Sequence, residues 1–301
     1  MDNDKKFVKK IKKVYRDLNF VISYKNKSIL KEEQGNQLIV KKIEANLPCM
    51  IARLGSVETK CLYPWIKGTI PSEKVLINGM YQAGIFPPTR EDNALFSKIY
   101  SNAISEVDIM ALCSVYKERE IVNTFCKNST FVKARSLEPY YFEKPWSKTL
   151  TGKKVLIIHP FIESIKKQYL IREKIFINKA TLPKFKSLSL LSAVQSNAGA
   201  TSDFDTWHSA YEFMCEEICK LDFEVALIGA GAYGLPLAAH VKTIGKIGIQ
   251  MSGATQILFG IKGKRWDDHP IISKLYNENW IRPSLEETPP QIDKVEGGSY
   301  W

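Results

Sequence analysis

Apolar and polar residues follow two different patterns along this chain, and each pattern predicts a different kind of element. Apolar residues at helical spacing predict helices over residues 91–107, 164–173, 207–220 and 235–244, with Asp92 as the N-cap of the first. Short runs that suit buried or half-buried strands lie at residues 47–53, 109–113, 132–137, 155–158, 185–192, 225–228 and 247–251. Because strands and helices alternate, we predict an α/β fold with a mostly parallel, Rossmann-like sheet and helices on both faces.

The two ends of the chain have patterns of their own. Lysines alternate with apolar residues at helical spacing over residues 5–18, which predicts a basic amphipathic helix that lies on an anionic membrane or packs on its own domain. We expect this helix and a linker to occupy residues 1–35, and a single α/β domain to occupy residues 36–301. Residues 60–71 are expected to be irregular. From about residue 266 the chain is rich in Pro, Trp and Tyr and is expected to wrap the domain.

The net charge of +11 narrows the range of partners. It favours anionic partners such as nucleotides, sugar phosphates or a membrane surface, and no recognised motif points to nucleic acid. No apolar run approaches the roughly 20 residues that cross a bilayer, and the charged start lacks a signal-peptide core. We therefore expect a cytoplasmic protein, with peripheral contact at the inner face of the membrane through residues 5–18.

The strongest motif is the G-x-G-x-x-G loop formed by Gly229, Gly231 and Gly234. It joins a predicted strand to a predicted helix, and that layout suits a phosphate group bound at a helix N-terminus. A tight turn that contacts no ligand is the alternative. An NAD site would place an acidic residue after the next strand, where this chain has Gln250, so the loop is a poor match to a nicotinamide cofactor.

Polar turns follow two more predicted strands. Arg53 could clamp a diphosphate, and Glu58 could hold a divalent cation or act as a base; a helix N-cap at Ser56 with an early-turn acid is the alternative. His159, at the end of another strand, is a candidate general base or a structural histidine. If the strands are parallel, the turns at residues 53–58, 159–164 and 229–234 converge on one edge of the sheet.

Residues 252–256 and the basic residues after them add further candidates. Small side chains and hydroxyls after the strand at 247–251 suit a diphosphate or a sugar, although another helix N-cap is equally compatible with them. Lys262, Lys264 and Arg265 could neutralise phosphates.

Two stretches resemble a known family. The pattern Arg53-Leu-Gly55-Ser56-Val-Glu58, followed by Asn78 and Ala83-Gly84-Ile-Phe86-Pro87, resembles the N-terminal half of GT-D-type glycosyltransferases. Those proteins carry Arg-Phe-Gly-Asp-Gly-Glu, so Ser56 replaces their aspartate. Much of the remaining chain, including residues 152–156, 159–161, 231–236 and 252–266, resembles bacterial proteins associated with surface-polysaccharide loci.

The resemblance implies a glycosyltransferase that moves a sugar from a nucleotide-sugar donor to a cell-surface glycan or a lipid-linked acceptor. It implies a metal or donor role for Glu58, with Mn²⁺ or Mg²⁺ as the expected cation. With the turns described above, the predicted catalytic residues are Glu58, His159 and Glu163. The predicted donor-binding residues are Arg53, Gly55, Ser56, Asn78, Gly84, Ser164, Gly229, Gly231, Tyr233, Gly234, Gln250, Gly253, Thr255 and Gln256. The alternatives are an NAD(P)-dependent oxidoreductase and a non-catalytic protein that binds a nucleotide or sugar phosphate.

Overall fold

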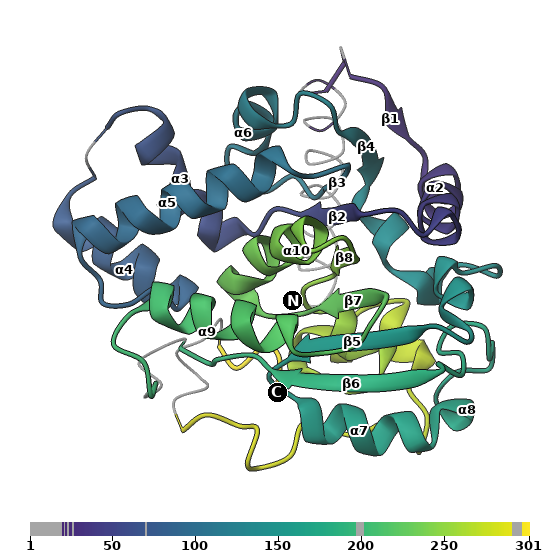
Figure 1. Cartoon of the computed structure of the whole chain (residues 1–301). Coiled ribbons are helices and arrows are strands. Elements are labelled where there is room, and N and C mark those ends of the chain that lie inside the picture. The colour runs from purple at the N-terminus through teal and green to yellow at the C-terminus, as the bar shows by residue number, and fades with distance from the viewer. Residues whose placement is uncertain are drawn as a thin grey trace, which may run out of the picture.

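A computed structural model describes residues 20, 22, 24–25, 27–69, 71–196, 202–290 and 297–301 of the chain. Its centre is one parallel sheet with the strand order β1-β4-β3-β2-β8-β7-β5-β6 (Figure 1). The strands are β1 (Ile29–Leu30), β2 (Cys49–Arg53), β3 (Ile109–Leu112), β4 (Thr130–Lys133), β5 (Lys154–His159), β6 (Ser187–Ser192), β7 (Val225–Ile228) and β8 (Ile247–Gln250). The predicted α/β class with a parallel sheet is confirmed. The predicted helix over residues 5–18 lies outside the described residues.

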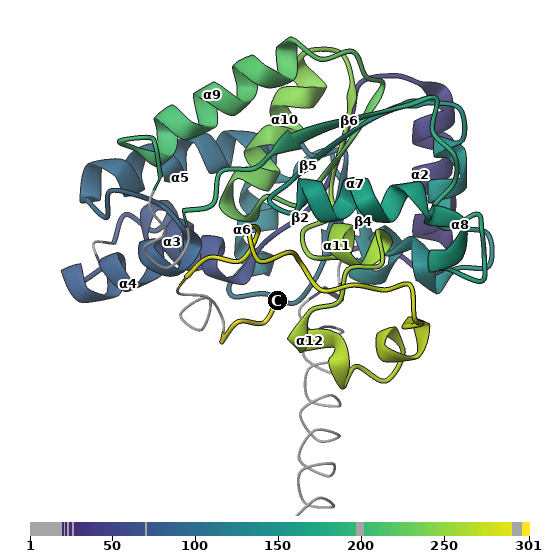
Figure 2. The same ribbon diagram turned by 90° about the horizontal axis from the view of Figure 1, so that it is seen from below.

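Helices cover both faces of this sheet (Figure 2). The longer helices are α2 (Glu32–Ala45), α3 (Ser56–Ile66), α4 (Glu73–Ala83), α5 (Arg90–Ser105), α6 (Glu118–Phe125), α7 (Ile162–Leu170), α9 (Trp207–Cys219) and α10 (Gly234–Thr243). Three short ones are α8 (Arg172–Ile175), α11 (Ala254–Leu258) and α12 (Lys264–Asp267). No helix among the described residues is long and apolar enough to span a membrane.

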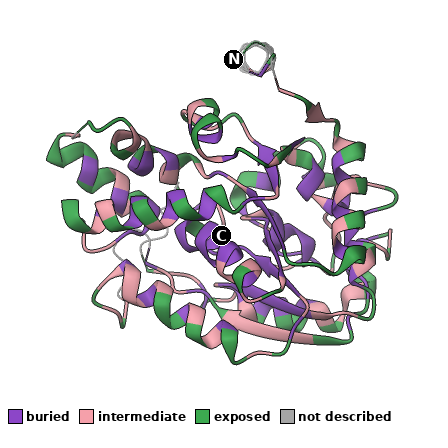
Figure 3. Ribbon diagram, turned by 45° about the horizontal axis from the view of Figure 1, so that its top comes forward, coloured by how far each residue is buried: buried purple, intermediate pink, exposed green. Residues whose placement is uncertain are grey.

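Alternate strand residues enter two separate hydrophobic cores, one on each face of the sheet. Met50 and Ala52 of β2 pack with α3, α5, α9 and α10, whereas Cys49 and Ile51 pack with α2, α7 and α11. The central strands are buried on both faces, which explains why their sequences are continuous apolar runs (Figure 3). Because neighbouring strands pair in parallel, their carboxyl ends lie at one edge of the sheet.

Several predicted boundaries differ from the structure. The N-cap of α5 is Thr89, whose hydroxyl accepts a hydrogen bond from the Asp92 N–H at 3.1 Å, so Asp92 is the third helical residue instead. The strand predicted at 132–137 is shorter, because β4 passes into the 3₁₀ turn η1 (Ala134–Leu137). Residues 60–66, predicted irregular, belong to α3, which continues past Pro64. The predicted boundary at residue 35 falls inside α2, and β1 already pairs with β4.

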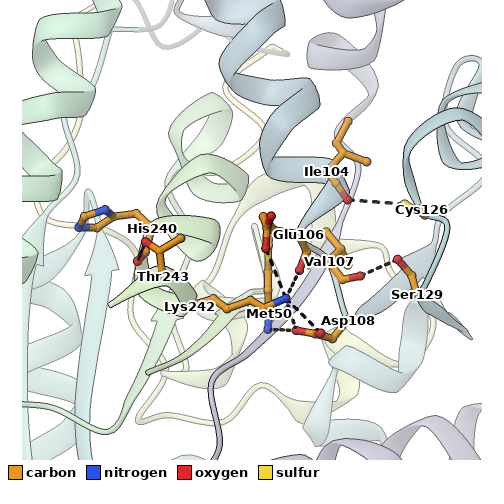
Figure 4. A network of polar contacts seen from close by, with 10 residues as sticks. All are labelled: Met50, Ile104, Glu106, Val107, Asp108, Cys126, Ser129, His240, Lys242 and Thr243. Carbon is orange, nitrogen blue, oxygen red and sulfur yellow. Dashed lines mark hydrogen bonds and ion pairs between the residues drawn. The ribbon is translucent and has the colours of Figure 1, made fainter. Parts of the chain in front are cut away.

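A polar network lies at the amino ends of β2 and β3, at the edge of the sheet opposite their carboxyl ends (Figure 4). The Asp108 carboxylate accepts a hydrogen bond from the Met50 N–H at 2.7 Å and pairs with the Lys242 ammonium at 3.1 Å. Lys242 also donates to the Glu106 carbonyl at 2.6 Å, so α10 is tied to the turn that leads into β3. This network joins the start of β2 and the turn before β3 to α10.

Replacing Asp108 by alanine should therefore destabilise the whole domain. The Met50 N–H loses its acceptor and Lys242 loses its closest carboxylate, so we expect the free energy of unfolding to fall by about 1–3 kcal/mol. The matched control is Glu106→Ala, which removes only an exposed carboxylate 3.6 Å from Lys242 and should change the stability by less than about 0.5 kcal/mol. Urea denaturation of both variants measures the difference. Equal losses would contradict the role given to Asp108.

Candidate functional site

A cavity of about 350 Å³ lies at the carboxyl edge of the sheet. The ends of four neighbouring strands contribute to its wall: Arg53 of β2, Gln250 of β8, Gly229 after β7 and His159 of β5. Gly55, Ser56, Glu58, Gly231, Gly253 and Gln256 also line it. The prediction that the turns after β2, β5 and β7 meet at one edge is confirmed.

Arg53 places a partly buried positive charge in the cavity wall. Its Nε atom is buried without a hydrogen-bond partner, and within the described ranges its guanidinium forms no ion pair with a carboxylate. Acidic groups around it, Cys113 first and then Glu138, Tyr300 and Glu118, raise the pKa of Arg53, although burial opposes them. The guanidinium is therefore always charged and keeps donors for a ligand.

Gln250 holds the end of β2 in place. Its side-chain oxygen accepts a hydrogen bond from the Arg53 N–H at 2.9 Å, and its amide nitrogen donates to the Ser252 hydroxyl at 2.7 Å. An amide can make both bonds because it is at once a donor and an acceptor, whereas a carboxylate can only accept. The structure thus gives Gln250 a bridging role between two strand ends, in addition to its place in the cavity wall.

His159 is a neutral hydrogen-bond donor in this environment. Burial lowers its pKa to about 3, so the imidazole is uncharged at neutral pH. Its Nδ1 accepts a hydrogen bond from the Phe161 N–H at 3.0 Å, which places the proton of the neutral ring on Nε2. A protonated nitrogen cannot take up a proton, so this geometry favours donation to a ligand over the general-base role predicted from the sequence.

The glycine loop approaches its neighbours too closely for a side chain. A Cβ on Gly229 would lie 2.6 Å from the His159 ring and 2.8 Å from the Ser252 carbonyl oxygen. Gly231 opens the 3₁₀ turn η5 (Gly231–Tyr233) with φ +51°, and a Cβ there would meet no atom within 4 Å. Gly229 is therefore required by packing, whereas Gly231 supplies a left-handed turn beside open space.

Glu58 is the third residue of α3 and lies over the start of that helix. A Cβ on Gly55 would be 2.0 Å from its carboxylate, so the acid folds back against the N-cap glycine. Within the described ranges, no three His, Cys, Asp or Glu side chains gather as metal ligands.

Two of the predicted residues are engaged away from the cavity. The Ser164 hydroxyl and N–H and the Glu163 N–H all donate to the Glu287 carboxylate, which thus caps the N-terminus of α7. The Glu163 side chain is exposed on that helix and does not line the cavity. The sequence did not reveal this contact, because Glu287 comes from a segment more than 120 residues further along the chain.

The other predicted donor-binding residues do not line the cavity. Tyr233 stacks on Trp207 with ring centroids 4.9 Å apart, and Gly84 ends α4 and accepts a hydrogen bond from the Ser196 hydroxyl at 2.6 Å. Asn78 is exposed on α4. The remaining two are Gly234, which starts α10, and Thr255, whose buried hydroxyl has no partner among the described residues.

The C-terminal segment closes one side of the cavity, as expected of a wrapping segment but with more direct contact. Tyr300 and Trp301 line the cavity, and the Gln256 amide donates to the Tyr300 carbonyl at 2.7 Å. The Trp301 indole donates to the Glu287 carbonyl at 3.0 Å. Arg265, also in the lining, lies 4.8 Å above the Tyr300 ring. The end of the chain is visible between α3 and α12 in Figure 2.

Glu138 is a cavity residue that was not among the predicted site residues, although it directly follows the strand predicted at 132–137. It lies between η1 and the 3₁₀ turn η2 (Pro139–Tyr141), beyond the carboxyl end of β4. Burial raises its pKa, and the positive charges of Arg53 and Arg135 act in the opposite direction. Its neighbours in sequence form no motif, and only the folded chain brings it to the same cavity as Arg53.

Comparison with known proteins gives a limited result. No family model matches the chain, and no curated protein matches it. Among solved structures, the chain is similar to one described as the selenomethionine-substituted structure of domain of unknown function 1792 (DUF1792). The TM-score is 0.48 and the identity 12%, over 78% of this chain and 82% of that chain. At this level the likeness transfers neither a site nor an activity.

The neutral state of His159 predicts a pH effect on stability. Its pKa of about 3 lies below the ordinary value of 6.5, so between these values the unfolded chain binds a proton that the folded chain does not. Stability should then fall as the pH drops below 6.5. Between pH 7 and pH 5 the wild type should lose about 2 kcal/mol more than His159→Asn, whose amide oxygen can still accept from Phe161. Denaturant unfolding at both pH values measures this, and parallel losses would contradict it.

The two glycines of the loop are predicted to differ in how far a side chain at each position lowers the stability. Gly229→Ala should lower the free energy of unfolding by about 1–3 kcal/mol, because the new methyl group overlaps the His159 ring and a carbonyl oxygen. Gly231→Ala meets no neighbour and should lose only about 1 kcal/mol through its left-handed backbone. Thermal or urea unfolding of the pair tests the assignment. A wild-type stability for Gly229→Ala would show that the loop is not packed as described.

Proposed function

We propose that this protein is a glycosyltransferase that transfers a sugar from a nucleotide-sugar donor to a cell-surface polysaccharide or glycan acceptor. The observation that carries the proposal is the Arg53 guanidinium, a charged group in the cavity wall without an ion-pair partner among the described residues. A buried charge is costly unless a counter-charge accompanies it, so the site is suited to an anionic ligand. A guanidinium binds phosphate oxygens through two parallel hydrogen bonds.

The rest of the cavity suits the diphosphate of such a donor. Its volume of about 350 Å³ falls within the range of small-molecule sites. Arg265 brings a second positive charge, and Gly231 leaves the backbone open to close approach. The resemblance of residues 53–58 and 78–87 to GT-D-type glycosyltransferases supports glycosyl transfer as the reaction, in preference to other uses of a diphosphate.

In the proposed reaction, an acceptor hydroxyl oxygen attacks the anomeric carbon of the donor sugar. The bond from that carbon to the phosphate oxygen breaks, and the nucleoside diphosphate leaves with the electron pair. Arg53, Arg265 and the Nε2–H of His159 stabilise the negative charge that develops on the leaving group. Without a metal, Glu58 is the proposed acceptor of the proton that the attacking hydroxyl loses. If Mn²⁺ or Mg²⁺ is bound, Glu58 would hold the cation and the hydroxyl proton would pass to water. A bound divalent cation would add further positive charge at the diphosphate.

The geometry around Gln250 disfavours the alternative of an NAD(P)-dependent oxidoreductase. This residue occupies the position where such an enzyme needs an acid for the ribose hydroxyls. Both ends of its amide are already bonded, to the Arg53 N–H and to the Ser252 hydroxyl. A ribose would have to compete with these contacts.

The proposal predicts selective binding of a nucleoside diphosphate. We expect one of UDP, GDP, CDP or ADP to raise the melting temperature of the full chain, with or without Mn²⁺, and NAD(H) to leave it unchanged. Arg53→Gln should weaken that binding at least about tenfold, because the phosphate loses charge-assisted hydrogen bonds. The matching nucleotide sugar should be turned over with release of the nucleoside diphosphate.

The control is Arg172→Gln, which removes a cation that pairs with Glu173 and does not line the cavity. It should leave nucleotide binding unchanged. Stabilisation by NAD(H) alone would favour the oxidoreductase, and nucleotide binding without turnover would favour a non-catalytic binding protein. Equal binding by the wild type and Arg53→Gln would remove the main support for the proposal.

A further inference from the structure

Glu138 is a half-buried acid in the cavity wall, and its carboxylate accepts no hydrogen bond from the described residues. The Glu118 carboxylate accepts from the Tyr24 hydroxyl and from the N–H groups of Cys113 and Ser114, all at 2.8 Å. Within the described ranges, no donor reaches the Glu138 carboxylate, although burial raises its pKa. A half-buried carboxylate that faces a cavity and accepts no hydrogen bond from the protein can accept one from a ligand.

The surroundings of Glu138 hold its backbone while leaving its side chain unbonded. Pro139 follows it directly, and the Ser136 hydroxyl anchors the preceding turn by donating to the Glu32 carbonyl at 3.1 Å. The charged groups that act on it are Arg53, Arg135 and Glu32. Arg135 already pairs with Glu32 at 3.4 Å, so its charge is compensated locally.

Arg53 and Glu138 line the same cavity, and each charge shifts the pKa of the other, yet they form no ion pair with one another. A ligand that satisfies both groups needs an anionic part for the guanidinium. It also needs hydrogen-bond donors nearby, because an ionised carboxylate only accepts. A plain phosphate or a nucleoside diphosphate presents the anion but offers no hydroxyl donor next to its terminal phosphate. A glycosyl diphosphate presents both.

We propose that Glu138 binds the hydroxyl groups of the sugar in the donor while Arg53 binds the diphosphate. This inference rests on the proposed function and deepens it, since it names the residue that distinguishes a nucleotide sugar from its nucleoside diphosphate. Glu138 then selects donors by their sugar hydroxyls. Removing its carboxylate should weaken the binding of the sugar and leave Arg53 able to bind the diphosphate.

The test is a comparison of dissociation constants by calorimetry for four ligand pairs: UDP with UDP-glucose, GDP with GDP-mannose, CDP with CDP-glucose, and ADP with ADP-glucose. The measured quantity is the dissociation constant of the nucleotide sugar divided by that of its nucleoside diphosphate, for the pair that the wild type binds. In Glu138→Ala this ratio should rise at least about tenfold. The nucleoside diphosphate itself should bind equally well or more tightly, because a negative charge near Arg53 is gone. Glu138→Gln keeps the size of the side chain and one acceptor, so it should show a smaller shift.

The matched control is Glu118→Gln, which also removes a negative charge that acts on Arg53 but does not line the cavity. It should leave the ratio of the two dissociation constants unchanged, even if the melting temperature falls. An unchanged ratio in Glu138→Ala, an equal shift in Glu118→Gln, or wild-type binding of a nucleoside diphosphate but of none of the nucleotide sugars would overturn the inference. Wild-type binding of none of the eight ligands would instead overturn the proposed function, and this inference with it.

Discussion

The positive charge of Arg53 is the feature on which the site depends. A guanidinium in the wall of a partly buried cavity is stable only where polar and acidic groups offset the loss of water. In this protein the acidic residues Glu138 and Glu118 act on it and raise its pKa, without an ion pair to Arg53 among the described residues. The charge is thereby kept in the folded chain and its hydrogen-bond donors are left for a ligand.

The parallel sheet determines where that charge lies. Arg53 is the last residue of β2, and its backbone is held by Gln250 at the end of the adjacent β8. The next two strands, β7 and β5, end at Gly229 and His159, which are packed against each other without room for a side chain on the glycine. The carboxyl edge is therefore closely packed at the glycine loop, and Tyr300 and Trp301 of the C-terminal segment also line the cavity.

Local signals in the sequence were sufficient to predict the central elements. Continuous apolar runs identified β2, β3, β5, β7 and β8. The predicted polar turns at residues 53–58, 159–164 and 229–234 begin at the carboxyl ends of β2, β5 and β7. The prediction that these turns meet needed only the general rule that ligands bind at the carboxyl ends of parallel strands. Arg53, Glu58, His159 and Gly231 were selected on that basis, and all four line the cavity.

The remaining features depend on contacts between distant segments and left no local signal. Ser164 was expected to contact a ligand because it follows a strand, but the Glu287 carboxylate occupies that helix N-terminus. Glu138 follows the strand predicted at 132–137, but β4 ends at Lys133 and no motif marked the acid. Tyr300 lines the cavity, and contacts to distant residues such as Gln256 hold the segment that carries it. α4 was not predicted. Its exposed Val75 and Ile77 obscure the helical pattern, since they lie on the solvent side.

A crystal structure of the full chain with the nucleoside diphosphate that stabilises it most would test the central claim directly. The account predicts that two oxygens of the diphosphate lie about 2.7–2.9 Å from the Arg53 guanidinium, the distance of a charge-assisted hydrogen bond. It also predicts that the Gln250 amide keeps its bonds to the Arg53 N–H and the Ser252 hydroxyl. A diphosphate bound elsewhere, with Arg53 still without an anion, would contradict it.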